Sequence, residues 1–312
     1  MITGTSSLRR IERRLARMEA HLTEVYSRAD AEMREKADKF FAQFEAKDAE
    51  KRKKVKAGKL SLKEYEKWRK NKILYSRRFS DFRKKTAHEL SRINETALAY
   101  INSEVLPVFA DNCNDFGKSI VLDVNTRFDA GLTFDLVDAD TLRLLAAEHP
   151  ELLPTLPEEK LVNIPLDERW NRELMQTELL QGILQGESIP DIAARMRNVV
   201  HMNKVSAVRN ARTMVTSAQN GGRVEGMRRA EKLGVLEEKE WMSFDDRRRR
   251  PAHGELDGKS VPVDDYFVNS IGKIRFPGDP HADPKNVQNC RCTLGVKVIG
   301  FRDPVTGKVR YV

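Results

Sequence analysis

The sequence has little cysteine, few aromatic residues and no long apolar run. Its three cysteines, Cys113, Cys290 and Cys292, make an odd count that does not fit the disulfide framework of a small secreted domain. No stretch approaches the roughly 18 apolar residues that cross a bilayer, and the N-terminus shows no apolar signal core. We therefore expect a chain without a membrane partner, made in a reducing cytoplasm, that stays soluble or enters a soluble assembly.

The motifs of common hydrolases and nucleotide-binding enzymes are also missing. The sequence has no nucleophile elbow, no Walker loop and no His-Glu-x-x-His pattern. Asp245, Asp246, His253 and Asp257 lie close together, but ion pairs with the arginines at 247–250 and a role in turns explain them more simply. We predict that the chain is not an enzyme.

Charge, in contrast, is abundant and unevenly placed. Charged residues make up 33% of the 312 residues and hydrophobic residues 40%, a mixture that favours two domains with long exposed helices. The net charge is +9, yet residues 51–92 alone hold 17 Lys or Arg against 4 Asp or Glu, while the first fifty residues balance. Such a segment suits a polyanion, most commonly nucleic acid; a solvated helix face is the alternative interpretation.

Two groups of basic residues are the candidate phosphate contacts. The first belongs to the basic segment, and the second is a run of arginines whose planar side chains fit phosphates or carboxylates bidentately. Together they are Lys51, Arg52, Lys53, Lys54, Lys56, Arg69, Lys70, Lys72, Arg77, Arg78, Arg247, Arg248, Arg249 and Arg250.

The N-terminal third predicts a helical hairpin. Gly58 marks the end of a first helix, and Ser61-Leu-Lys-Glu64 is a capping box that opens a second, expected from about Leu62 to Val105 and ended by Pro107. The basic segment would lie at the tip and along the second arm. Aromatic residues at helical spacing in this arm favour a core role over base stacking. The first helix carries a heptad seam formed by Leu8, Ile11, Leu15, Met18, Leu22 and Val25.

The middle of the chain gives weaker signals. We expect residues 119–124 to form a short strand, residues 140–149 a helix, and Cys113 to be a lone buried thiol. Three helices should follow: one ending at Gly186, one opened by Ser188-Ile-Pro190-Asp191, and one from about Lys204 to Leu233. Gly221-Gly222 should interrupt the last of these. The apolar face expected for the first of the three is Leu166, Trp170, Leu174, Leu180, Ile183 and Leu184.

Beyond residue 236 the composition changes to Gly, Pro and Asp, which indicates a small antiparallel module. Strands are expected at 240–244, 261–263, 273–276 and 293–298. The predicted fold class is therefore α+β, mostly α-helical, with a long N-terminal helical hairpin and a small antiparallel β-containing C-terminal domain. The predicted organisation is a basic hairpin arm (1–107), a connector (108–165), a helical part (166–236) and a β-rich module (237–312).

The module holds one candidate metal site. Residues two apart in a strand point the same way, so Cys290 and Cys292 would aim at one place, and His253 or His281 could complete a zinc site. The spacing is not that of a standard zinc finger. Packed thiols are the alternative, and we predict no cofactor, with zinc kept as the open possibility.

The order of motifs in this module resembles a known family. Trp241 and a short Asp-containing segment precede His253 and the turn Leu256-Asp257-Gly258; Phe276-Pro-Gly-Asp279 and Asn289-Cys-Arg-Cys292 follow. Together they resemble the C-terminal domain of phage minor head proteins, the head-morphogenesis family that includes the F-like protein of phage Mu, over about residues 165–298. Two features depart from many relatives: residues 249–252 replace a Cys-x-x-Cys, and Met214 replaces a Glu.

The resemblance implies a structural role in a tailed phage. A protein of this family would lie inside the head near the portal, after assembly in the host cytoplasm, with a part in DNA packaging or ejection. Its expected partners are the portal protein, a major capsid or scaffold protein, and double-stranded DNA bound without sequence preference. The alternatives are a zinc-dependent nucleic-acid-processing enzyme that uses His253, and a host coiled-coil adaptor that binds nucleic acid.

Overall fold

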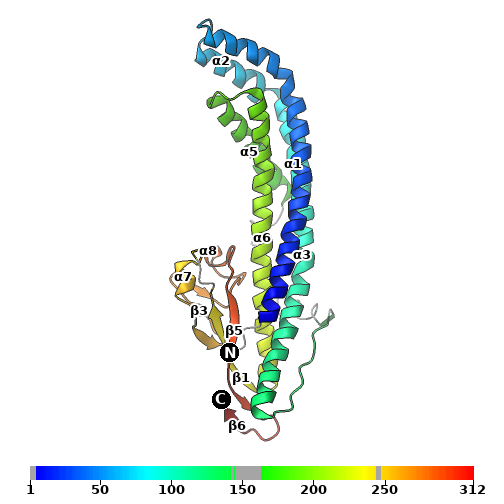
Figure 1. The fold of residues 1–312 in the computed structure, drawn as a ribbon, viewed down its shortest axis with the longest axis vertical. Coiled ribbons are helices and arrows are strands. Elements are labelled where there is room, and N and C mark those ends of the chain that lie inside the picture. The colour runs from blue at the N-terminus through cyan, green and yellow to red at the C-terminus, as the bar shows by residue number, and fades with distance from the viewer. Residues whose placement is uncertain (1–4, 139, 142–143, 145–162, 244–246) are drawn as a thin grey trace. The chain divides into compact units, whose positions relative to one another are not determined.

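The computed structural model describes residues 5–138, 140–141, 144, 163–243 and 247–312. It confirms the α+β class, with long helices followed by a small antiparallel sheet (Figure 1). No helix among these residues is both long and apolar enough to cross a membrane. The helices of five or more residues are α1 (Thr5–Lys56), α2 (Leu62–Arg69), the π-helix η1 (Lys70–Leu74), α3 (Arg77–Phe128), α5 (Ile164–Leu184) and α6 (Ile189–Lys232). The expected helix at 140–149 lies mostly outside the described residues.

The chain forms two compact units. One contains residues 1–19, 100–160 and 209–312, and the other residues 20–99 and 161–208. Three helices, α1, α3 and α6, contribute segments to both. Each unit is therefore built from stretches that are distant in sequence.

The predicted hairpin is present in both units. In the second unit Tyr26 donates a hydrogen bond to Asn94, and Lys36 pairs with Glu89, so α1 and α3 run antiparallel. In the first unit Arg10 pairs with Asp115. The buried seam of α1 runs further than expected because alanines extend it: its buried residues are Ile11, Met18, Leu22, Tyr26, Ala29, Met33, Ala37, Phe41 and Asp48.

The caps at the hairpin tip are confirmed, but the second arm differs from the prediction. Gly58 has φ +69°, and the Ser61–Glu64 capping box is complete. However, α2 gives way to η1 at Lys70, and α3 begins only at Arg77. The prediction that Pro107 ends the helix is wrong, since α3 continues to Phe128. Pro107 lies on the exposed side of α3, where solvent can satisfy the carbonyl that loses its partner.

Buried amides order the bundle of the second unit. Asn203, on α6, donates to the side-chain oxygen of Asn171 on α5 at 2.8 Å and lies next to the amide of Asn94 on α3. Asn94 also donates to Asp167 and accepts from the buried hydroxyl of Tyr26. A satisfied polar network of this kind works in only one helix register, so it specifies how these helices pair.

The apolar face predicted for α5 is wrong except at Ile183, which is buried as expected. Leu166, Trp170 and Leu184 are exposed, whereas the buried residues of this helix are Asn171, Met175, Leu179, Gly182 and Ile183. The hydrogen-bonded Asn171 turns a different face inward from the one that hydropathy alone selects. The end signal at Gly186 (φ +69°) and the capping of the next helix by Ser188 are confirmed.

Two further predictions fail where helices α3 and α6 pack in the first unit. Residues 119–124 are helical, not a strand, and α6 is one helix that passes through Gly221-Gly222 without interruption. A Cβ on Gly222 would lie 2.3 Å from the carbonyl oxygen of Phe109, and one on Gly226 would lie 2.8 Å from that of Cys113. These glycines therefore allow two helix backbones to approach closely, which compensates for their weak helix propensity.

The sheet follows α6. Its order is β2 (Ser260–Pro262), β1 (Val235–Met242), β5 (Thr293–Arg302) and β6 (Val309–Tyr311), all antiparallel. A separate pair joins β3 (Phe267–Val268) to β4 (Lys273–Ile274). The register places Trp241 opposite Leu294 and Met242 opposite Thr293. The end of β1 is thereby set beside the start of β5, where the Cys-Arg-Cys segment lies.

We predict that Gly222→Ala destabilises the protein. The added methyl group would force the α3 and α6 backbones apart, which costs about 1–3 kcal/mol of unfolding free energy and exceeds the gain in helix propensity of about 1 kcal/mol. Chemical denaturation would measure the change. Gly254→Ala is the control, because a Cβ there meets only the flexible Arg249 side chain at 3.4 Å. An equal effect of both substitutions would contradict the close-packing explanation.

Candidate metal centre and its support on α6

His253 is placed by a short helix that the sequence encodes locally. Helix α7 (Pro251–Gly254) begins with proline in its first turn and follows Arg250 in extended conformation. The His253 ring is buried, 3% exposed, and contacts the Trp241 indole edge-on at a centroid distance of 5.5 Å. Its Nε2 atom faces the backbone carbonyl of Asn286 at 3.0 Å and the side-chain oxygen of the same residue at 3.2 Å.

The two cysteines meet this ring from the segment that leads into β5. Asn289, at φ +56°, turns the chain and donates its backbone N–H to Thr213 of α6 at 3.0 Å. The Sγ atoms of Cys290 and Cys292 then lie 3.6 and 3.3 Å from His253 Nδ1. These three donor atoms lie within 4.8 Å of one another, and all three residues are buried. His281, the other predicted histidine, is exposed and is not part of this group.

The two thiols have unequal environments. The hydrogen bond with Cys292 lowers the pKa of the Cys290 thiol, and the same bond together with burial raises that of Cys292. The backbone N–H of Cys292 also donates to Cys290 Sγ at 3.4 Å. The group contains two thiols and an imidazole, which are donors that zinc takes in proteins.

The two turns of the module have identifiable roles. Gly258 (φ +74°) donates its N–H to the Trp241 carbonyl at 2.8 Å, and Asp257 accepts from Ser243 N at 2.8 Å, so this turn closes onto β1. In the second turn, a Cβ on Gly278 (φ +84°) would lie 2.7 Å from the backbone nitrogen of Ser217 on α6. Glycine is required there by both conformation and space.

Asp279 fixes the second turn electrostatically. Its carboxylate accepts hydrogen bonds from the backbone and side chain of Arg275 and from His281 N. Burial raises the pKa of Asp279, but these hydrogen bonds, mainly from Arg275, outweigh burial and lower it overall. The carboxylate is thus charged at neutral pH and holds the turn in shape.

Asn220 on α6 is a supporting residue that the sequence did not reveal. Its side chain is fully buried; Nδ2 donates to the carbonyl oxygens of Pro277 at 3.1 Å and Cys292 at 3.3 Å, and Oδ1 accepts from Leu294 N at 2.9 Å. A single amide therefore connects the Phe276-Pro-Gly-Asp279 turn, the Cys-Arg-Cys segment and β5. Isolated asparagines leave no spacing pattern, so no sequence signal marked this one.

The comparison with known proteins agrees with this arrangement. The family model described as Phage Mu protein F like protein matches residues 173–295, which include α6, His253 and both cysteines of the candidate centre. The matched segment is similar to the phage Mu F-like head-morphogenesis family. The resemblance stated for about residues 165–298 is thereby confirmed.

Two relatives are similar over different shares of the chain. The minor head protein GP7 of Bacillus phage SPP1 is 29% identical over 217 residues, which cover 69% of this chain and 67% of that protein. The NAD(+)--arginine ADP-ribosyltransferase EFV of Enterococcus faecalis is 30% identical over 128 residues, which cover 40% of this chain but 26% of that protein. No solved structure matches the chain. The assignment as a phage minor head protein rests on the family model and the SPP1 relative.

Both departures from the family pattern now have a place in the structure. Met214, where many relatives carry Glu, is buried on α6 with 4% of its surface exposed. At 249–252, Arg250 donates to the Gln288 carbonyl and Arg249 lies 3.6 Å from the Asp257 carboxylate. In this minor head protein, contacts made by Arg249 and Arg250 therefore hold in place the segment where many relatives carry cysteines.

The structure separates the predicted phosphate contacts into exposed and structural groups. Arg69 is fully buried, 3.2 Å from Asp48, and burial lowers the pKa of its guanidinium. It cannot meet a phosphate at the surface, so including it was wrong. Arg52 also pairs with Asp48, and its Nε donates to the Tyr65 hydroxyl. The exposed members of the predicted set are Lys53, Lys54, Lys56, Lys72, Arg77, Arg78, Arg247 and Arg248.

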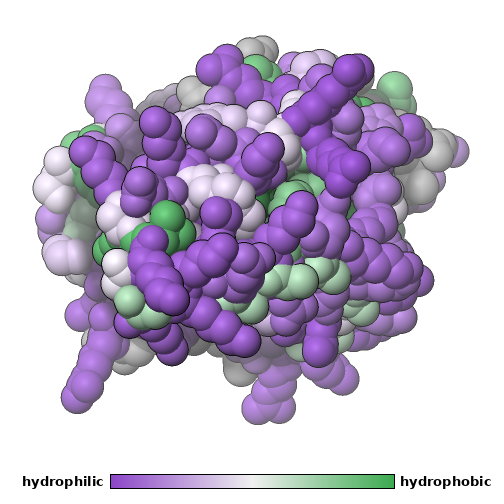
Figure 2. Space-filling model, turned by 90° about the horizontal axis from the view of Figure 1, so that it is seen from above, coloured by the Kyte–Doolittle hydropathy of each residue, from purple (hydrophilic) through white to green (hydrophobic). Residues whose placement is uncertain are grey.

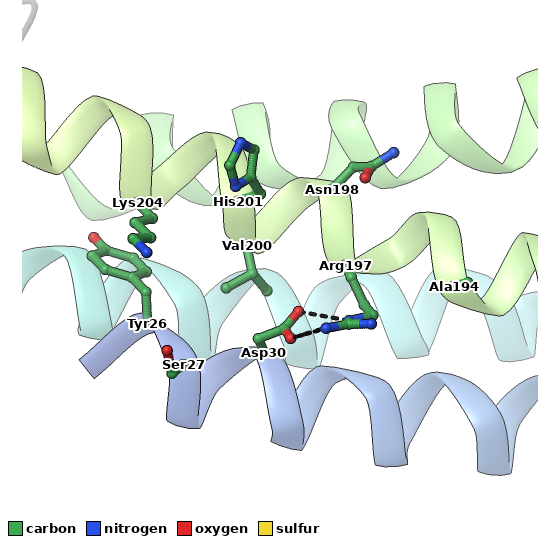
Figure 3. A pocket seen from close by; sticks show the side chains of 9 residues that line it. All are labelled: Tyr26, Ser27, Asp30, Ala194, Arg197, Asn198, Val200, His201 and Lys204. Carbon is green, nitrogen blue, oxygen red and sulfur yellow. Dashed lines mark hydrogen bonds and ion pairs between the residues drawn. The ribbon is translucent and has the colours of Figure 1, made fainter. Parts of the chain in front are cut away.

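A hollow in the second unit offers no chemistry comparable with that of the candidate metal centre (Figure 3). It lies between α1 and α6, where Arg197 directs its guanidinium onto both carboxylate oxygens of Asp30, at 2.9 and 3.0 Å from Nε. His201 and Lys204 line the same hollow. Its principal charged groups already neutralise each other, so it has the character of a helix–helix contact.

We predict that Asn220→Ala destabilises the protein by roughly 2–3 kcal/mol. The substitution leaves the buried Leu294 N–H and two carbonyl oxygens without their partner. Thermal or chemical denaturation would measure the loss. Asn198→Ala is the control, because Asn198 is also an α6 asparagine but is exposed and bonds only to Glu178. Similar losses in the two variants would contradict the role given to Asn220.

Proposed function

We propose that this minor head protein docks at the portal inside the head and contacts genomic DNA without sequence preference. In this proposal the protein acts by binding and catalyses no reaction. The observation that carries the DNA contact is a concentration of exposed lysines at the tip of the helical hairpin. The similarity to a phage minor head protein supports the proposed portal contact.

The tip lysines extend over the end of α1, the following turn and α2. Lys53, Lys56, Lys63 and Lys67 are exposed, and in the described part of the chain no carboxylate lies within ion-pair distance of any of them. Figure 2, which looks onto the bundle end that carries α2, shows a surface dominated by hydrophilic side chains. The charges of these four lysines are therefore available to an external polyanion.

Most aromatic residues in and near the tip are used internally, although Tyr75 is 68% exposed. Phe40 stacks on Phe82 with ring centroids 4.8 Å apart, and Phe79 is fully buried. Trp68 is covered by the ammonium group of Lys51 at 5.3 Å. Base stacking therefore has little part in the proposal, and phosphate charge provides the attraction. Contacts of that kind release counterions, weaken steeply with salt and carry little sequence information.

We predict that replacing Lys53, Lys56, Lys63 and Lys67 with Gln weakens duplex DNA binding more than roughly tenfold at low salt. The slope of log K against log salt should fall by about 0.9 for each phosphate that the variant no longer neutralises. Fluorescence anisotropy with two unrelated duplexes, over a series of salt concentrations, would measure both effects. Equal affinity for the two duplexes is expected.

The matched control replaces four exposed lysines of the other unit, Lys118, Lys232, Lys297 and Lys308, with Gln. Both variants lose the same net charge, so only the position of the charge differs between them. If the two variants bind equally weakly, net charge alone governs binding and the hairpin tip is not the contact. If wild-type binding is independent of salt, the electrostatic proposal is wrong.

We predict that the portal protein co-purifies with this chain from an assembling phage lysate. A tagged chain would be captured during infection, and its partners identified by mass spectrometry against an untagged infection. The four-lysine tip variant should still capture the portal protein, because DNA contact and portal docking are separate in the proposal. Capture of major capsid or scaffold protein without the portal protein would contradict portal docking.

A further inference from the structure

The cluster of His253, Cys290 and Cys292 is not explained by packing alone. Two buried thiols face a single imidazole nitrogen, with Nδ1–Sγ distances of 3.6 and 3.3 Å. One nitrogen lone pair can accept one S–H hydrogen bond with good geometry, so within the cluster the other thiol can bond only to its neighbouring thiol, a weak acceptor. A shared cation satisfies all three groups at once.

The hydrogen bonds around His253 determine which of its nitrogens is free. Asn269 Oδ1 accepts from the backbone N–H groups of Ile271 and Gly272, at 2.9 and 3.1 Å, which fixes the orientation of the Asn269 amide. Asn269 Nδ2 therefore donates to Asn286 Oδ1, at 3.0 Å. The Asn286 side chain is fixed in turn, with its oxygen toward His253.

His253 Nε2 consequently faces two acceptors, the carbonyl oxygen and Oδ1 of Asn286. A nitrogen between two acceptors carries the proton, so Nδ1 presents its lone pair toward the thiols. A metal-binding histidine is usually oriented in this way, by donation from its other ring nitrogen to a carbonyl or carboxylate. Asn286 thus acts as a positioning residue, and the turn at 269–272 positions Asn286.

The dimensions and charge of the cluster fit zinc. Metal–ligand distances of about 2.0–2.3 Å in a tetrahedral site place ligand atoms roughly 3.5 Å apart, close to the Nδ1–Sγ distances here. Two thiolates neutralise the charge of a divalent cation, which reduces the cost of burying it among Trp241 and neighbouring apolar groups. Binding releases the two thiol protons to solvent.

We propose that His253, Cys290 and Cys292 bind one zinc ion per chain, which holds helix α7 against the segment leading into β5. These ligands come from two segments of the module, so the ion links them. A solvent molecule supplies the fourth ligand. The ion stabilises the module, and the proposal does not depend on portal docking or DNA binding.

The test begins with wild-type protein that is expressed in zinc-supplemented medium and purified under reducing conditions without chelator. Elemental analysis is expected to give one zinc per chain. Replacement with cobalt should produce the charge-transfer absorption of thiolate–cobalt bonds and the ligand-field bands of tetrahedral coordination. Substoichiometric zinc, or a cobalt spectrum without thiolate bands, would overturn the proposal. So would a Cys290–Cys292 disulfide, located by peptide mass mapping of wild-type protein purified without reductant.

The cysteine variants provide the matched comparison. Cys290→Ser and Cys292→Ser should lose stoichiometric zinc, whereas Cys113→Ser should retain it, because Cys113 is buried on α3 outside the cluster. Chelation should lower the melting temperature of the wild type and leave that of Cys290→Ser unchanged. Zinc retained by both site variants would overturn the assignment, even if the wild type contains metal.

Asn286→Leu tests the positioning role. It should lower zinc affinity by about tenfold, at the lower end of the range for such supporting residues because the backbone carbonyl of residue 286 remains. Asn286→Asp retains an acceptor for His253 Nε2 and should restore most of the affinity. A metal-dye competition on protein with an unchanged circular dichroism spectrum would measure both. Equal losses in the two variants would assign Asn286 a packing role only.

Discussion

One face of α6, between Thr213 and Arg223, carries the interactions on which the C-terminal module depends. Arg223 is fully buried, donates to the Leu294 carbonyl of β5 and places its guanidinium 4.7 Å from the centre of the Phe116 ring on α3. Burial lowers the pKa of Arg223 to about 10, so the side chain is still charged at neutral pH. Asn220, one turn earlier, binds the same strand. The sheet is therefore built onto the helices, and its core includes α6.

Local signals in the sequence predicted several helix ends correctly. The helix ends and strand that were predicted wrongly depend on the surroundings of the residue in the fold. Gly58, the Ser61 capping box and Gly186 act through their own backbone conformation, and each was found as expected. Pro107 and Gly222 gave equally clear local signals that were misleading, because Pro107 lies on the exposed side of α3 and Gly222 packs against the α3 backbone. Residues 119–124 are helical although their β-branched residues favour a strand, and Ile120, Val121 and Val124 are buried there.

At the candidate centre, too, sequence patterns did not show which side chains that are distant in sequence come together. Cys290 and Cys292 were expected to face the same way as strand residues, but both precede β5 and meet His253 from the segment leading into it. The choice between His253 and His281 required the fold, since α7 places the His253 imidazole beside the two thiols. Asn220, Asn269 and Asn286 could not be found from sequence, because their roles depend on partners 17 to 74 residues away. Charge content also failed to distinguish Arg69, which is buried, from the lysines around it.

That distinction between arginine and lysine bears on how the protein could contact DNA. Arg52 and Arg69 have planar donor groups that meet Asp48, Tyr65 and backbone carbonyls, so they stabilise the hairpin tip from within. The exposed positions there are mostly lysines, whose flexible side chains carry a compact point charge. Such groups attract phosphates without defining a register, which fits the proposed DNA contact without sequence preference. An arginine-rich tip would instead hold individual phosphates bidentately.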